Sequence, residues 1–126
     1  MPAMPRRTIK QFREERAQGQ QLVMDCDHLG IKRFFRLDTA AYEDGPLPGR
    51  TKELLGLVAS AVLRCDDCVD YHLEQAVKAG WSREEIHDAL NVGLVVGGSI
   101  VIPHLRRAFA SLEELLAERA AGTLPG

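Results

Sequence analysis

Two cysteines three positions apart, Cys65 and Cys68, are the residues of this sequence whose types and spacing could do chemistry. Cysteines at this spacing can close a small disulfide loop, and the backbone N–H groups at the start of a helix stabilise a thiolate. His72 lies four residues after Cys68, so on a continuous helix its imidazole comes beside that sulfur and can exchange a proton with it. The pattern predicts an activated, redox-type thiol.

A carboxylate in an apolar segment adds to this pattern. Glu53 precedes Cys65 by twelve positions and is followed by Leu54, Leu55 and Leu57. Such a carboxylate either points to solvent as a first-turn acid or is held inside by a partner, for which His72 is the natural candidate. In the second case, Glu53 orients the imidazole and sustains its proton transfer to Cys68.

Helices must position these residues, because apolar residues recur at helical spacing and strand-like alternation is scarce. We expect one all-α domain over residues 1–126, with an N-terminal helical arm at 1–45 and a helical core at 46–119. The two parts are separated by the breaker Gly45–Gly49, which holds two prolines. The core is predicted to contain helices at about 51–63, 66–79 and 82–97, and a last one beginning near Pro103.

Several local signals refine this prediction. Thr8 and Gln11 form a capping box for a first helix reaching about Met24, whereas residues 25–42 indicate only one or two short helical turns. Residues 51–63 are apolar almost all round, so we expect this helix to be buried on most of its faces with help from a subunit interface. On the helix at 66–79, the side chains expected to face inward are Cys68, Val69, His72, Leu73, Ala76 and Val77. On the helix at 82–97 they are Ile86, Leu90, Gly93, Leu94 and Gly97, and on the last helix they are Leu105, Phe109, Leu112 and Leu116.

Composition excludes several classes of protein. The chain has 126 residues with 16 basic and 18 acidic side chains, a formal net charge of −2, and no basic stripe, which argues against nucleic acid as a partner. A membrane span needs about 20 apolar residues, and the chain has no such run. The charged start of the chain does not read as a signal peptide, so we expect a cytoplasmic protein. Three cysteines, an odd number, argue against a stapling disulfide framework.

Glu53, the Cys65-x-x-Cys68 pair, His72 and the run AVKAGWSREEIHDALNVGLVVGG together resemble the AhpD-like branch of the carboxymuconolactone decarboxylase superfamily. The resemblance covers residues 43–118 and implies an all-helical bundle assembled as trimers or hexamers. It also implies a thiol-dependent hydroperoxide reductase or disulfide reductase. The CxxC pair of that branch is oxidised by hydroperoxide and reduced again by a dithiol partner, such as a lipoyl group or a thioredoxin-like protein.

In the mechanism that these residues predict, Cys68 attacks with help from His72 and Glu53, and Cys65 resolves the oxidised product. The order of the two cysteines stays open, since the first cysteine of such a pair is usually the more exposed one. The sequence departs from the prototype branch at Asp67, where that branch carries histidine. Two carboxylates, Asp66 and Asp67, are expected to oppose thiolate formation electrostatically, although both also read as capping residues.

Other interpretations compete with this one. The cysteines could simply pack, or Cys26, Cys65, Cys68 and His72 could hold a structural zinc ion. A lactone decarboxylase of the same superfamily is a third possibility, but it has no evident need for a vicinal dithiol. We favour the redox reading with no cofactor and no metal. Cys26 is expected to be inert, His104 to be a surface or packing residue, and Arg107 to lie on a solvated face.

Overall fold

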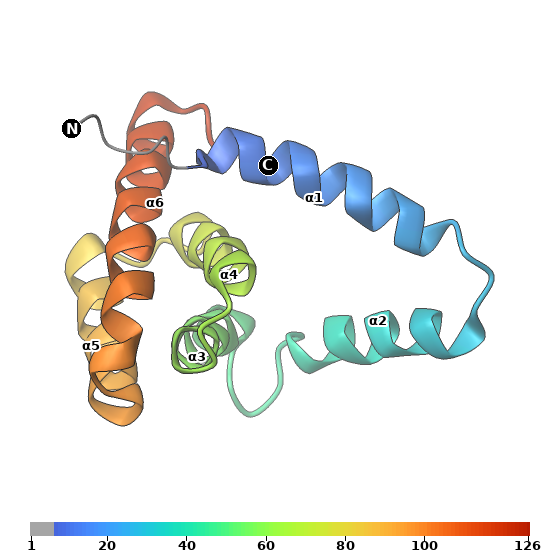
Figure 1. Cartoon of the computed structure of the whole chain (residues 1–126), viewed down its shortest axis with the longest axis horizontal. Helices are drawn as coiled ribbons and strands as arrows, with labels where there is room; N and C mark the ends of the chain where they lie inside the picture. Colours follow the sequence, from blue (N-terminus) through green and yellow to red (C-terminus); the bar gives the residue numbers. More distant parts are fainter. Residues whose placement is uncertain (1–6) are drawn as a thin grey trace. The chain divides into compact units, whose positions relative to one another are not determined.

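The computed structural model describes residues 7–126, and every regular element in that range is a helix. The chain forms two compact units, which meet in sequence between Glu43 and Asp44. Figure 1 shows the helices in chain order. None of the helices formed by residues 7–126 combines the length and apolar character needed to cross a membrane. The predicted all-α class is confirmed.

The first unit contains α1 (Ile9–Met24) and α2 (Leu29–Ala41). The predicted capping box starts α1, since Thr8 accepts from the backbone N–H of Gln11 and the Gln11 side chain accepts from that of Thr8. The prediction of one or two short turns for residues 25–42 was wrong, because α2 is a continuous helix. Its N-cap is His28, whose imidazole accepts the Ile31 N–H, and histidine is not a residue that usually signals a helix start.

The second unit consists of α3 (Gly49–Val62), α4 (Asp66–Lys78), α5 (Arg83–Gly97), the short 3₁₀ helix η1 (Ser99–Val101) and α6 (Ile102–Ala121). Its boundaries follow the predicted signals. Gly80, with a φ of 90°, closes α4, and a capping box between Ser82 and Glu85 opens α5. Pro103 stands in the first turn of α6, where its missing N–H costs no hydrogen bond.

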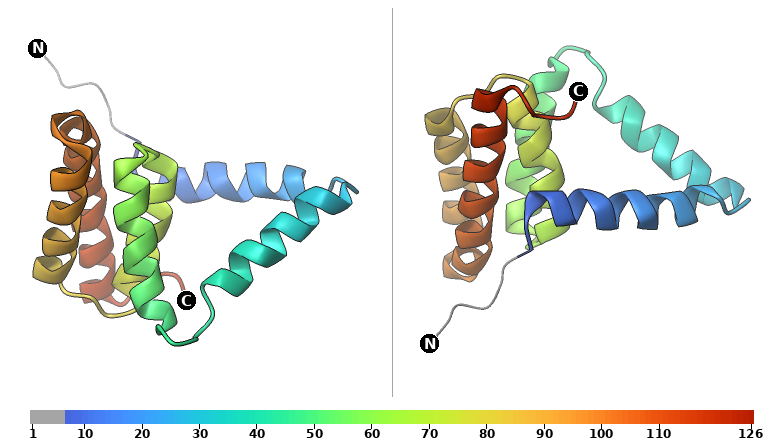
Figure 2. Two further views of the ribbon diagram at one scale, coloured as in Figure 1. Left: turned by 90° about the horizontal axis from the view of Figure 1, so that it is seen from below. Right: turned by 90° about the horizontal axis from the view of Figure 1, so that it is seen from above.

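The core of the second unit is formed by side chains of α3, α4, α5, η1 and α6. Helix α3 packs against α4 and α5, and α4 packs against α6, as both views of Figure 2 show for the α3 and α4 pair. The fully buried side chains come from all of these elements: Leu57, Leu73, Val77, Ile86, Leu90, Val101, Leu112 and Leu115. Burying each of these large side chains contributes about 1.5 to 3 kcal/mol to folding.

Within this chain Leu57, Ser60 and Ala61 are the buried residues of α3, while Leu55 is 54% exposed, so the expectation that a subunit interface covers the rest of this helix stays a prediction. Two other details of the predicted faces were wrong. In α6 the buried face consists of Ala108, Ser111, Leu112 and Leu115, so the large residues Leu105, Phe109 and Leu116 flank it. Cys68 was also misplaced, because it is exposed and does not lie on the buried stripe of α4.

Candidate active site

The turn between α3 and α4 aims Cys65. Helix α3 ends in a paired hydrogen-bond motif, in which the Arg64 N–H donates to the Ala61 carbonyl at 3.0 Å and the Cys65 N–H donates to the Ser60 carbonyl at 3.1 Å. Arg64 supplies the left-handed residue that this motif needs, with a φ of 60°. Cys65 therefore ends the motif of α3 and at the same time serves as the N-cap of α4.

The two cysteines are joined as a disulfide, with Cα atoms 5.2 Å apart. The backbone N–H of Cys68 also donates to Cys65 Sγ over 3.2 Å, so the sulfur of the N-cap residue receives one of the helix's first donors. This donor stabilises negative charge on Cys65 Sγ when the bond is reduced. Cys68 is exposed and Cys65 is half-buried, so Cys68 is the sulfur that an incoming molecule reaches more easily.

Glu53 and His72 form a pair across two helices. His72 Nδ1 lies 2.8 Å from Glu53 Oε2, and the two side chains are only 11% and 16% exposed. Of the two alternatives considered for Glu53, the structure shows the second, in which a partner holds the carboxylate inside. An ionised carboxylate only accepts hydrogen bonds, so Nδ1 is the donor, and Nε2 is the ring nitrogen that can take up a proton.

The structure brings the four predicted site residues together as two pairs, the Cys65–Cys68 disulfide and the Glu53–His72 hydrogen bond. His72 follows Cys68 by one turn on the continuous helix α4, with His72 buried and Cys68 exposed. Cys26 is elsewhere in the sequence, in the first unit, as a half-buried free thiol. Among residues 7–126 no group of three or more histidine, cysteine or carboxylate side chains is arranged to hold a metal ion.

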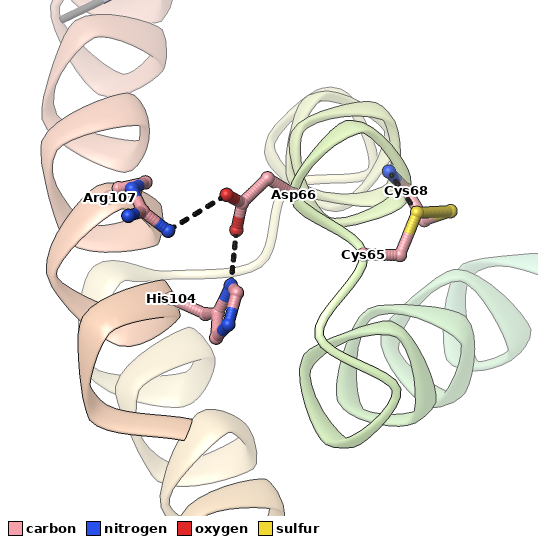
Figure 3. A network of polar contacts seen from close by, with 5 residues as sticks. All are labelled: Cys65, Asp66, Cys68, His104 and Arg107. Atoms are coloured by element: carbon pink, nitrogen blue, oxygen red, sulfur yellow. Dashed lines mark hydrogen bonds and ion pairs between the residues drawn. A yellow bond between two sulfur atoms is a disulfide. The ribbon is translucent and has the colours of Figure 1, made fainter. Parts of the chain in front are cut away.

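A network next to the disulfide was missed by the sequence analysis. Asp66 Oδ1 lies 2.7 Å from His104 Nδ1, and Asp66 Oδ2 accepts from Arg107 Nη1 at 2.9 Å (Figure 3). His104 and Arg107 are three residues apart on α6 and so share a face, which was the one available signal. Periodicity within α6 could not reveal that this face meets the first turn of α4.

Comparison with known proteins decides the family. The model of the carboxymuconolactone decarboxylase family matches residues 31–111, well over half of the chain. The chain belongs to the carboxymuconolactone decarboxylase family. The resemblance inferred from Glu53, the cysteine pair and His72 is thereby confirmed at the level of the superfamily.

Other members of the carboxymuconolactone decarboxylase family share the fold. A crystal structure of one from Thermotoga maritima, for which a role in the antioxidative response has been suggested, superposes with a TM-score of 0.84. That protein is 55% identical, and the match covers 89% of this chain and 95% of the other. An uncharacterized protein of Cupriavidus necator is 33% identical over 78 residues, which are 62% of this chain and 69% of that protein.

The alkyl hydroperoxide reductase AhpD of Anaeromyxobacter sp. is also similar to this family member. It is 39% identical over 49 residues, which are 39% of this chain and 26% of that enzyme. The chain thus matches about a quarter of the length of AhpD.

Proposed function

We propose that this protein is a thiol-dependent hydroperoxide reductase, a peroxiredoxin-type activity that uses Cys65 and Cys68 as its redox pair. The observation that carries the proposal is the disulfide at the start of α4, followed one helical turn later by His72, whose imidazole is held by the shielded Glu53 carboxylate. A disulfide formed between an exposed and a half-buried sulfur is open to exchange, and a carboxylate-held imidazole is a suitable proton acceptor.

In the proposed cycle, His72 accepts the proton of the reduced Cys68 thiol while Glu53 stabilises the imidazolium. The Cys68 thiolate attacks the terminal oxygen of a hydroperoxide, ROOH. The O–O bond breaks, Cys68 becomes a sulfenic acid, and the leaving alkoxide takes a proton to give ROH. The Cys65 sulfur then attacks the sulfenic sulfur, forming the disulfide and releasing water. The exposure of Cys68 supports its role as the sulfur that attacks first.

The cycle closes when an external dithiol reduces the disulfide. The dithiol supplies two electrons and two protons and becomes a disulfide itself, which suits a lipoyl group or a thioredoxin-like protein. A disulfide substrate in place of the hydroperoxide would use the same exchange step. The odd number of cysteines fits a compartment that keeps thiols reduced, and we propose the cytoplasm. The vicinal cysteines favour this chemistry over lactone decarboxylation, which needs no dithiol.

We further propose that the protein works as a homo-oligomer, a trimer or hexamer. Val92, Val95 and Val96 of α5 are 56%, 76% and 69% exposed, and their spacing places them on one helix face. A cluster of exposed branched apolar residues is typical of an interface. Light scattering on the wild type is expected to give the mass of an oligomer, and Val95→Asp is expected to lower it. A monomeric wild type would contradict this part of the proposal.

The experiment that tests the activity is intact-mass analysis of the reduced protein before and after about one equivalent of an organic hydroperoxide. We expect the loss of two hydrogens, mapped by peptide analysis to Cys65–Cys68. Cys68→Ser is expected to abolish disulfide formation, His72→Ala to slow it, and the matched control Cys26→Ser to leave it unchanged. An unchanged mass, with both thiols of the pair still open to alkylation, would overturn the proposal.

A further inference from the structure

Asp66 is the residue directly after Cys65 and the first residue of α4, yet its carboxylate belongs to a contact with α6. Both carboxylate oxygens are used, Oδ1 by His104 Nδ1 at 2.7 Å and Oδ2 by Arg107 Nη1 at 2.9 Å. Figure 3 shows the carboxylate pointing toward α6, while the two sulfurs lie on the other side of the first turn of α4. The redox pair and this ion pair therefore share one helical turn and face opposite ways.

This arrangement matters because the reduced dithiol carries negative charge when it reacts. An unpaired carboxylate beside a thiol disfavours the thiolate, since like charges repel. A guanidinium stays protonated at every physiological pH, so Arg107 cancels the charge of Asp66 continuously. His104 donates a second hydrogen bond and fixes the direction of the carboxylate.

We propose that Asp66, His104 and Arg107 are positioning residues for the redox pair. His104 and Arg107 hold the Asp66 carboxylate and compensate its charge, and this compensation sets the stability of the Cys65–Cys68 dithiol relative to the disulfide. The inference rests on the proposed function, because it concerns the same cysteines. It does not require that the oxidant be a hydroperoxide. By stabilising thiolate, a less negative surrounding favours the reduced form, whereas an unpaired carboxylate favours the disulfide.

The test separates charge from structure. Asp66→Asn removes a negative charge and leaves Arg107 in place, so the thiolate to thiol ratio of the reduced pair is expected to rise. Arg107→Gln leaves Asp66 without its cation, so the same ratio is expected to fall. The double variant is expected to return close to wild type. A unit charge on the order of 10 Å away, at an effective dielectric constant of about 40 to 80, predicts a change of about twofold to fourfold for each single variant.

Two measurements on the full-length protein give these values. The first is the thiolate fraction of the reduced protein, followed by its ultraviolet absorbance. The second is the equilibrium with dithiothreitol, in which the protein disulfide gains two electrons and two protons and dithiothreitol becomes its cyclic disulfide. Arg106→Gln is the matched control, because Arg106 is exposed and adjacent to Arg107 in the sequence. This substitution removes the same charge as Arg107→Gln, and it is expected to have a smaller effect.

The outcomes are distinct. Opposite shifts in the two single variants, cancelled in the double variant, support the inference. Shifts in the same direction, not cancelled in the double variant, would mean that the network only holds α4 against α6, and equal values in all variants would mean that it has no influence. Neither measurement uses a hydroperoxide, so a wild type that fails to reduce hydroperoxide would refute the proposed function and leave this inference to its own test.

Discussion

Replacing the carboxylate that holds His72 is the most direct test of the proton-transfer step. Glu53→Gln keeps the size and one hydrogen-bond acceptor of the side chain but removes its charge. Because the pair is 2.8 Å apart and both side chains are mostly shielded from solvent, its hydrogen bond is weakly screened. The substitution therefore changes one property, the stabilisation of a positively charged imidazole, with little change in packing.

The magnitude follows from the strength of the bond that is lost. A hydrogen bond to a charged group contributes about 1.5 to 3 kcal/mol, whereas a neutral one contributes about 0.5 to 1.5 kcal/mol. The difference is about 1 kcal/mol, which corresponds to about a fivefold slower step if the imidazolium forms fully in the transition state. His72→Ala removes the proton acceptor itself, so its effect on the rate is expected to be larger than that of Glu53→Gln.

The assay is the single-turnover rate of Cys65–Cys68 disulfide formation after mixing the reduced protein with an organic hydroperoxide. Glu113→Gln is the matched control, because Glu113 of α6 forms an exposed ion pair with Arg83 of α5 at 3.0 Å. The same chemical change there is expected to leave the rate unchanged. If Glu53→Gln reacts as fast as the wild type and as Glu113→Gln, the Glu53–His72 pair takes no part in the rate-limiting step.

Two further predictions concern stability. A Cβ at Gly97 would collide with the side chain of the fully buried Val101, so Gly97→Ala is expected to lower the free energy of unfolding by about 1 to 3 kcal/mol. Gly19 has open space around it, so Gly19→Ala is expected to raise the free energy of unfolding by about 0.5 to 1 kcal/mol. Urea unfolding measures both changes, and equal values for the two variants would contradict the packing argument. Hydrogen bonds from the backbone N–H and the hydroxyl of Ser82 lower the pKa of Glu85 below its ordinary value of 4.5. The stability that these bonds contribute is therefore complete above that pH and is lost as the pH falls through the folded-state pKa. The thermal unfolding temperature of Glu85→Gln should approach that of the wild type in acid, and a constant difference at all pH values would refute this prediction.

The local structure of the second unit could be read from the sequence because its signals act over a few residues. The capping box of Ser82 and Glu85, the glycine after α4 and the proline at the start of α6 each specify a helix boundary through backbone geometry. The spacing of the cysteines and His72 also depends only on one helix. In the first unit the start of α2 could not be predicted, because its N-cap is a histidine, a residue that helix-capping rules do not anticipate.

Only the tertiary structure decided how separate helices meet. The choice between a solvated and a shielded Glu53 depended on the packing of α3 against α4, which places the carboxylate 2.8 Å from His72, nineteen residues away. The pairing of Asp66 with His104 and Arg107 depended in the same way on α4 against α6. A helical period shows which residues share a face but not which faces meet, so the sequence determined the reactive residues and their helices, and the packing decided their partners and their charge.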